Sequence, residues 1–89
     1  MSKYSASYLT EKLSKALEAT HVDVHDDSDG CGAKFSALIV SPKFEGLPLL
    51  QRHRLVNSTL QEELTTIHAF SQKTLTPAQW EEQKSKVAQ

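Results

Sequence analysis

The run Lys34-Phe35-Ser36-Ala37-Leu38-Ile39-Val40-Ser41 carries the clearest structural pattern in this 89-residue chain. Its aliphatic, aromatic and β-branched residues favour a β-strand. Pro42 follows directly and stops the run, because proline has no backbone N–H for a strand ladder. We therefore expect a strand that ends at Ser41, and the segments on either side decide what packs with it.

The segment before this strand predicts a second strand. Val22 and Val24 alternate with polar residues between positions 21 and 25, and a period of two indicates one buried face. Residues 26–32 break the pattern and are acidic. We expect the two strands to form a hairpin with a long loop, and Cys31 to lie near the tip of that loop.

Helical patterns flank this hairpin. From Ser7 to Ala19 we expect a helix that Ser5 or Ser7 caps. Its apolar residues recur at helical spacing: Leu9, Leu13, Ala16 and Leu17. Pro48 suits the first position of a second helix through about Asn57, and a further helical segment is expected from Ser58. The apolar side of these two segments is predicted to consist of Leu49, Leu50, Leu55, Val56, Leu60 and Leu64.

Strand character returns over residues 65–75, and a last helix follows it. Thr76 and Gln79 have the spacing of a capping box, Pro77 suits the first turn, and Trp80 begins the apolar side. The order αββααβα predicts one α+β domain over residues 1–89. We expect a three-stranded sheet with helices packed on one face and the other face partly open.

Size and composition limit the possible functions. A domain this small has little room for an internal substrate cavity, so we expect a function on the surface or at an interface. The non-enzymatic role that we expect comes from the family resemblance described below. The net charge of −1 provides no general attraction to nucleic acid or anionic membranes. The single cysteine excludes an internal disulfide, and no apolar leader or membrane span is apparent. The expected compartment is the cytoplasm, with the nucleus as a further location.

Cys31 and His68 are the candidate metal-ligating residues. Glycines 30 and 32 flank Cys31 and allow another molecule to approach it closely, which an inert buried thiol would not need. The nearby aspartates disfavour a reactive thiolate, but a bound metal deprotonates the thiol. The imidazole of His68 is largely neutral at cytosolic pH and can bind a metal. The residues alone leave an inert, a nucleophilic and a ligating Cys31 open, and a solvated His68 as well.

The chain resembles the BolA family, in particular its cytosolic branch, over nearly its whole length. The matching segments are Asp29-Gly30-Cys31-Gly32-Ala33-Lys34-Phe35, Arg52-His53-Arg54-Leu55-Val56 and Ile67-His68-Ala69-Phe70-Ser71-Gln72-Lys73-Thr74, followed by Thr76-Pro77. The resemblance implies a fold similar to the type II KH domain. It also implies a monothiol glutaredoxin as partner, in a heterodimer or heterotrimer with a bridging 2Fe-2S cluster that glutathione helps to hold.

The same resemblance implies roles for individual residues. His68 matches the family's histidine ligand, and Cys31 matches the loop position of the second ligand in this branch. No cluster is expected in the isolated chain. We expect six residues to contact the partner: Arg52, Arg54, Gly30, Gly32, Phe70 and Lys73.

Two further functions compete with the cluster adaptor. A KH-like nucleic-acid-binding regulator could use Arg52 and Arg54, but the chain has no Gly-x-x-Gly tetrapeptide, so nucleic acid is the less favoured partner. A thiol enzyme would use Cys31 as nucleophile and His68 as base.

Overall fold

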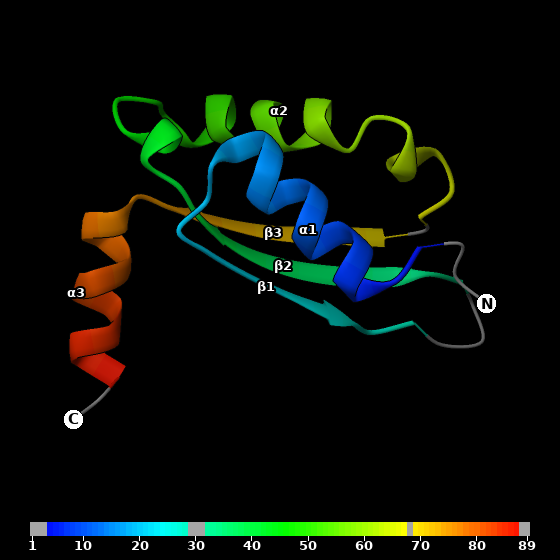
Figure 1. Cartoon of the computed structure of the whole chain (residues 1–89), viewed down its shortest axis with the longest axis horizontal. Helices are drawn as coiled ribbons and strands as arrows, with labels where there is room; N and C mark the ends of the chain where they lie inside the picture. Colours follow the sequence, from blue (N-terminus) through cyan, green and yellow to red (C-terminus); the bar gives the residue numbers. More distant parts are fainter. Residues whose placement is uncertain (1–3, 29–31, 68, 88–89) are drawn as a thin grey trace.

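The computed structural model describes residues 4–28, 32–67 and 69–87, and it has the expected α+β architecture (Figure 1). The elements in chain order are α1 (Ala6–Leu17), β1 (His21–Asp26), β2 (Lys34–Val40), the 3₁₀ turn η1 (Pro42–Phe44), α2 (Leu49–Thr59), the 3₁₀ turn η2 (Glu63–Thr65), β3 (Ala69–Leu75) and α3 (Pro77–Val87). Ser5 caps α1 by accepting a hydrogen bond from the Tyr8 amide. Within the described ranges, none of the helices has the length and apolar character needed to cross a membrane.

The three strands form one mixed sheet in the order β1-β2-β3. β1 pairs antiparallel with β2, which confirms the predicted hairpin. β3 pairs parallel with β2, from Lys34 opposite Ala69 to Val40 opposite Leu75. A parallel pair needs a long crossover, which η1, α2 and η2 provide. As a result β2 and β3 begin at the same end of the sheet.

Helices α1 and α2 cover one face of the sheet (Figure 1). Leu9, Leu13 and Leu17 of α1 are almost completely buried, as the spacing predicted, whereas Ala16 is exposed. The core between helices and sheet also contains Phe35, Ala37 and Ile39 of β2, Val56 of α2, and Leu60 and Ile67 of the crossover. Alternate residues of the central strand thus supply the inner face, as expected for a strand covered by helices.

Helix α3 lies apart from the other two helices, at the end of the sheet where β3 finishes (Figure 1). Trp80 stacks on His21 of β1, with ring centroids 4.7 Å apart and planes 14° from parallel. His21 lies opposite Val40, so by strand alternation it belongs to the face away from α1 and α2. The expectation of helices on one face therefore holds for α1 and α2, while α3 contacts the end of the second face.

The third strand starts later than predicted. Residues 63–65 form η2, and β3 begins only at Ala69. The carbonyl oxygen of Glu63 accepts hydrogen bonds from the amides of Thr66 and Ile67, at 3.1 and 3.2 Å, which keeps this segment in a tight turn. The β-branched threonines had suggested a strand. The further helical segment expected from Ser58 is reduced to this short turn.

The start of α2 also differs from the prediction. Pro48 is the cap and the helix begins at Leu49, so the proline lies one position earlier than expected. Leu49 and Leu50 are each 60% exposed and do not join the core. Arg52 instead occupies the position one turn before the buried Val56, and the apolar side of α2 is correspondingly shorter.

The predicted capping box at the start of α3 is present. The amide of Gln79 donates to Thr76 Oγ1 at 3.2 Å, and the amide of Thr76 donates to Gln79 Oε1 at 2.9 Å. These reciprocal bonds satisfy backbone donors that the helix itself leaves open. They also fix the direction in which α3 leaves β3.

Removal of this cap should destabilise the protein. We expect Thr76→Ala to lower the free energy of unfolding by about 1 kcal/mol, because the hydroxyl acceptor is lost. Thr76→Ser keeps the acceptor and should retain most of the stability. Urea unfolding followed by far-UV circular dichroism measures both; equal losses in the two variants would contradict a role for the hydroxyl.

Candidate functional site

The starts of β2 and β3 meet at one end of the sheet. The amide of Ala69 donates to the carbonyl oxygen of Ala33 at 3.1 Å and closes the first rung between the two strands. Gly32 precedes this rung with φ of 138°, a backbone conformation that favours glycine. We call this region, formed by residues 32–34, Ile67 and Ala69, the loop end of the sheet. Cys31, Gly30 and His68 lie outside the described residues.

Hydrogen bonds join the two sides of the hairpin close to the loop end. The amide of Asp27 donates to Lys34 O at 2.8 Å, and Ser28 Oγ accepts from the amide of Lys34 at 3.0 Å. Ser36 Oγ donates to Asp27 Oδ2 at 2.7 Å. The side chain and amide of Ser28 donate to Asp26 and hold the pKa of its carboxyl below the usual value. The carboxylates of Asp26 and Asp27 thus accept hydrogen bonds within the hairpin itself.

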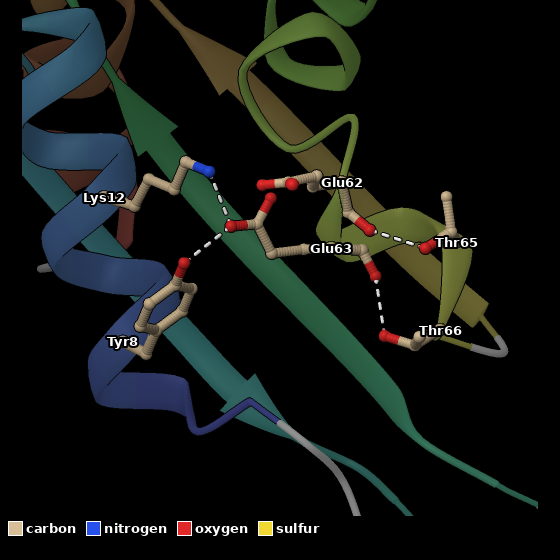
Figure 2. A network of polar contacts seen from close by, with 6 residues as sticks. All are labelled: Tyr8, Lys12, Glu62, Glu63, Thr65 and Thr66. Carbon is tan, nitrogen blue, oxygen red and sulfur yellow. Dashed lines mark hydrogen bonds and ion pairs between the residues drawn. The ribbon is translucent and has the colours of Figure 1, made fainter.

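A buried carboxylate, Glu63, joins η2 to α1 (Figure 2). Its side chain is only 1% exposed, and its Oε2 atom accepts hydrogen bonds from Tyr8 Oη at 2.7 Å and Lys12 Nζ at 2.5 Å. Burial acts to raise the pKa of Glu63, but the bonds from Lys12 and Tyr8 outweigh it and lower the pKa. The carboxylate is therefore ionised at neutral pH.

Sequence reasoning did not find this network. Tyr8 and Lys12 are four residues apart and share one side of α1, which is a local pattern. Glu63 is 51 residues beyond Lys12, and its neighbour Glu62 carries the same charge but is exposed. Only the fold distinguishes the two glutamates, because η2 turns Glu63 toward α1.

Arg52 forms internal hydrogen bonds at the opposite end of β3. Its Nε donates to Leu47 O at 2.9 Å, and its NH1 donates to Thr74 O at 3.3 Å and to Gln79 Oε1 at 2.9 Å. The side chain therefore connects α2, β3 and α3. Arg54, the second expected partner residue on this helix, is exposed. The fold does not bring Arg52 to the loop end.

Phe70 and Lys73 lie on opposite faces of β3. Phe70 is partly buried and packs against the core beneath the helices. Lys73 is paired in register with Leu38, exposed, and on the face away from α1 and α2. The two expected partner residues thus do not form one patch, and Lys73 shares its face with Ala69 at the loop end.

The fold and its loop end define a small α+β domain in which a hairpin loop and the start of a parallel strand share one edge. A family model described as BolA-like protein matches residues 13–79. "BolA-like protein 2" of Homo sapiens is 60% identical over 83 residues, which cover 92% of this chain and 96% of that protein. The corresponding protein of Mus musculus is 62% identical over 81 residues, covering 90% and 94%.

A solved structure gives the same result. The crystal structure of a Bol-like protein from Babesia bovis matches with a TM-score of 0.87 and 48% identity, over 93% of this chain and 96% of the other. The chain belongs to the BolA family.

Arg52 and Arg54 should differ in their effect on stability. We expect Arg52→Ala to lower the free energy of unfolding by about 1–2 kcal/mol, because two backbone carbonyls and Gln79 lose a donor. Arg54→Ala removes the same charge from an exposed position of the same helix and should change it by less than about 0.5 kcal/mol. Chemical unfolding of the two variants measures the difference, and similar losses would contradict the structural role of Arg52.

The Glu63 network should make stability depend on acid pH. The lowered pKa means that its contribution is present above the unfolded value near 4.5 and is lost as pH falls through the folded value. At pH 7 we expect Glu63→Gln to cost about 1–3 kcal/mol, and this cost should shrink below about pH 4.5. Unfolding curves between pH 3 and 7 test this, with the exposed Glu62→Gln as control. A cost that stays constant with pH would contradict the ionised network.

Proposed function

We propose that this BolA-family protein is a non-enzymatic adaptor that binds a monothiol glutaredoxin and co-ligates a bridging 2Fe-2S cluster through His68 and Cys31. The cluster is cargo in this proposal, passed on in cytosolic cluster trafficking or used in iron sensing. Membership of the BolA family supports the proposal. So does the arrangement of the segments that flank the two ligands.

The hydrogen bond from the Ala69 amide to Ala33 O is the single observation that carries the proposal. His68 immediately precedes Ala69, and Cys31 comes two residues before Ala33. Consecutive Cα atoms are about 3.8 Å apart, so each ligand is tied by a very short length of chain to one side of this bond. The connectivity therefore allows both side chains to serve one site at the loop end.

The chemistry of the two donors suits such a cluster. Thiolates ligate 2Fe-2S clusters, and histidine replaces cysteine in some of them. Two ligands from this chain leave the remaining iron positions to the glutaredoxin thiolate and to the thiolate of glutathione. An imidazole binds a metal only through an unprotonated ring nitrogen, so coordination by a histidine is sensitive to acid. This pair of ligands therefore fits a cluster that is shared and then released.

The positions of the expected docking residues narrow the proposed partner surface. Lys73 faces outward on the strand surface that begins at Ala69, so a partner that approaches the loop end along this surface can contact it. Arg52 is held by Leu47, Thr74 and Gln79, so it is less suited to docking. The same bonds weaken the alternative of a nucleic-acid-binding regulator, which depended on Arg52 and Arg54.

The proposal predicts a spectroscopic change on complex formation. The protein is mixed with a monothiol glutaredoxin that carries a 2Fe-2S cluster, in the presence of glutathione. We expect the visible absorption and circular dichroism to change with wild type, to stay unchanged with His68→Ala, and to change less with Cys31→Ala. His25→Ala, an exposed histidine of β1, should behave as wild type. Unchanged spectra with wild type would contradict the proposed function.

A further inference from the structure

We propose that Glu63 is a positioning residue for His68, because it fixes the turn that leads into β3 against helix α1. This inference rests on the proposed function, in which His68 is a ligand. Glu63 is five residues before His68 and does not itself contact the cluster in this proposal. Its effect passes through Thr66 and Ile67.

The side chain of Glu63 provides the first half of the connection. One carboxylate oxygen accepts from both Tyr8 and Lys12, which lie one turn apart on α1 (Figure 2). Helix α1 is held in turn by Leu9, Leu13 and Leu17, all buried in the core. Glu63 therefore joins η2 to a helix that three buried leucines hold against the sheet.

The backbone of Glu63 provides the second half. Its carbonyl oxygen accepts from the amides of Thr66 and Ile67 and from Thr66 Oγ1, the last at 3.1 Å. Ile67 is buried in the core, and the Ala69 amide is bonded to Ala33 O. The residues on both sides of position 68 are thus fixed, one by the turn from Glu63 and the other by the sheet.

The energetics of the pair argue for a positional role. An ion pair at a buried position gains little net stability, because desolvation of the carboxylate offsets its attraction to the lysine, and an apolar residue of similar size often stabilises as well. Moreover, the second carboxylate oxygen, Oε1, is buried without a hydrogen-bond partner among the described residues. An apolar side chain would avoid the cost of burying this unpaired oxygen. It could not accept the two hydrogen bonds from α1 that fix the position of η2 relative to that helix.

Amide hydrogen exchange in the protein without cluster tests the positioning directly. In Glu63→Leu we expect the amides of Thr66 and Ile67 to exchange about tenfold faster or more. The reason is that the turn opens more easily once the carboxylate no longer accepts the hydrogen bonds from Tyr8 and Lys12. The amides of Ala37 and Ile39 in β2 serve as a reference within the same molecule. Equal acceleration at both places, or none at the turn, would overturn the inference, because Glu63 would then act on global stability only.

Two further variants keep the test decisive if Glu63→Leu folds poorly. Tyr8→Phe/Lys12→Met retains Glu63 and removes its two donors, and the same local acceleration at Thr66 and Ile67 is expected. Lys15→Met is the matched control, because Lys15 pairs with Glu11 on the exposed side of α1. A double variant with wild-type exchange at the turn would overturn the inference.

The glutaredoxin complex provides the second readout. We expect Glu63→Leu to lower the yield of cluster-bridged complex about fivefold or more and to shift its circular dichroism toward that of His68→Ala. Glu63→Gln, which keeps the acceptor, should restore most of the wild-type spectrum, and Glu62→Leu at the exposed neighbour should not differ from wild type. Wild-type spectra in Glu63→Leu would overturn the inference. Absence of a complex with wild type would instead contradict the proposed function, while the exchange ratio still decides whether Glu63 holds the turn.

Discussion

The parallel pairing of β2 with β3 is the constraint on which the rest of the structure depends. It requires a crossover, and the crossover supplies α2, η1 and η2. It also brings the start of β3 beside the start of β2, so residues 32–34 and Ala69 share one edge of the sheet. An antiparallel β3 would have separated these segments by the length of a strand. The proposed ligand pair is thus a consequence of topology.

The two segments that meet at this edge are held by different means. The hairpin is joined by short-range hydrogen bonds among serines, aspartates and Lys34, all within a few residues of the loop. The turn before β3 depends on Glu63 and on two side chains of α1 that are more than 50 residues away in the chain. The hairpin is therefore held by contacts between residues close in sequence, whereas the turn before β3 is held only once α1 has packed on the sheet. A cluster bound at the loop end, as we propose, would lie between these two segments.

The sequence predicted the elements whose causes are local. These elements depend on periodicity or on residues within one turn, and the structure confirms them: Val22 and Val24, the β2 run, the leucines of α1 and the Thr76 capping box.

The prediction was incomplete for the elements whose structure depends on contacts between distant residues. Thr65 and Thr66 resembled a strand, but the carbonyl of Glu63 bends them into a turn. Leu49 and Leu50 were expected in the core, although the first turn of α2 leaves them exposed. Arg52 was expected to contact a partner, yet its guanidinium donates to three acceptors within the chain. Cys31 and His68 remain assignments based on family resemblance.

The stack of Trp80 on His21 has a consequence for how the molecule can be observed. Trp80 is the only tryptophan of the chain, so its emission arises from one place, the junction of α3 with the first residue of β1. Lys84 Nζ lies 5.7 Å from the indole centroid, and the His21 ring stacks on the indole, so the fluorophore has a polar side chain from α3 and another from β1 beside it. His21 pairs with Val40, at the far end of the sheet from Lys34 and Ala69. The fluorescence of Trp80 therefore reports whether α3 is docked on β1. A visible chromophore bound at the loop end would lie at the opposite end of the sheet from this fluorophore.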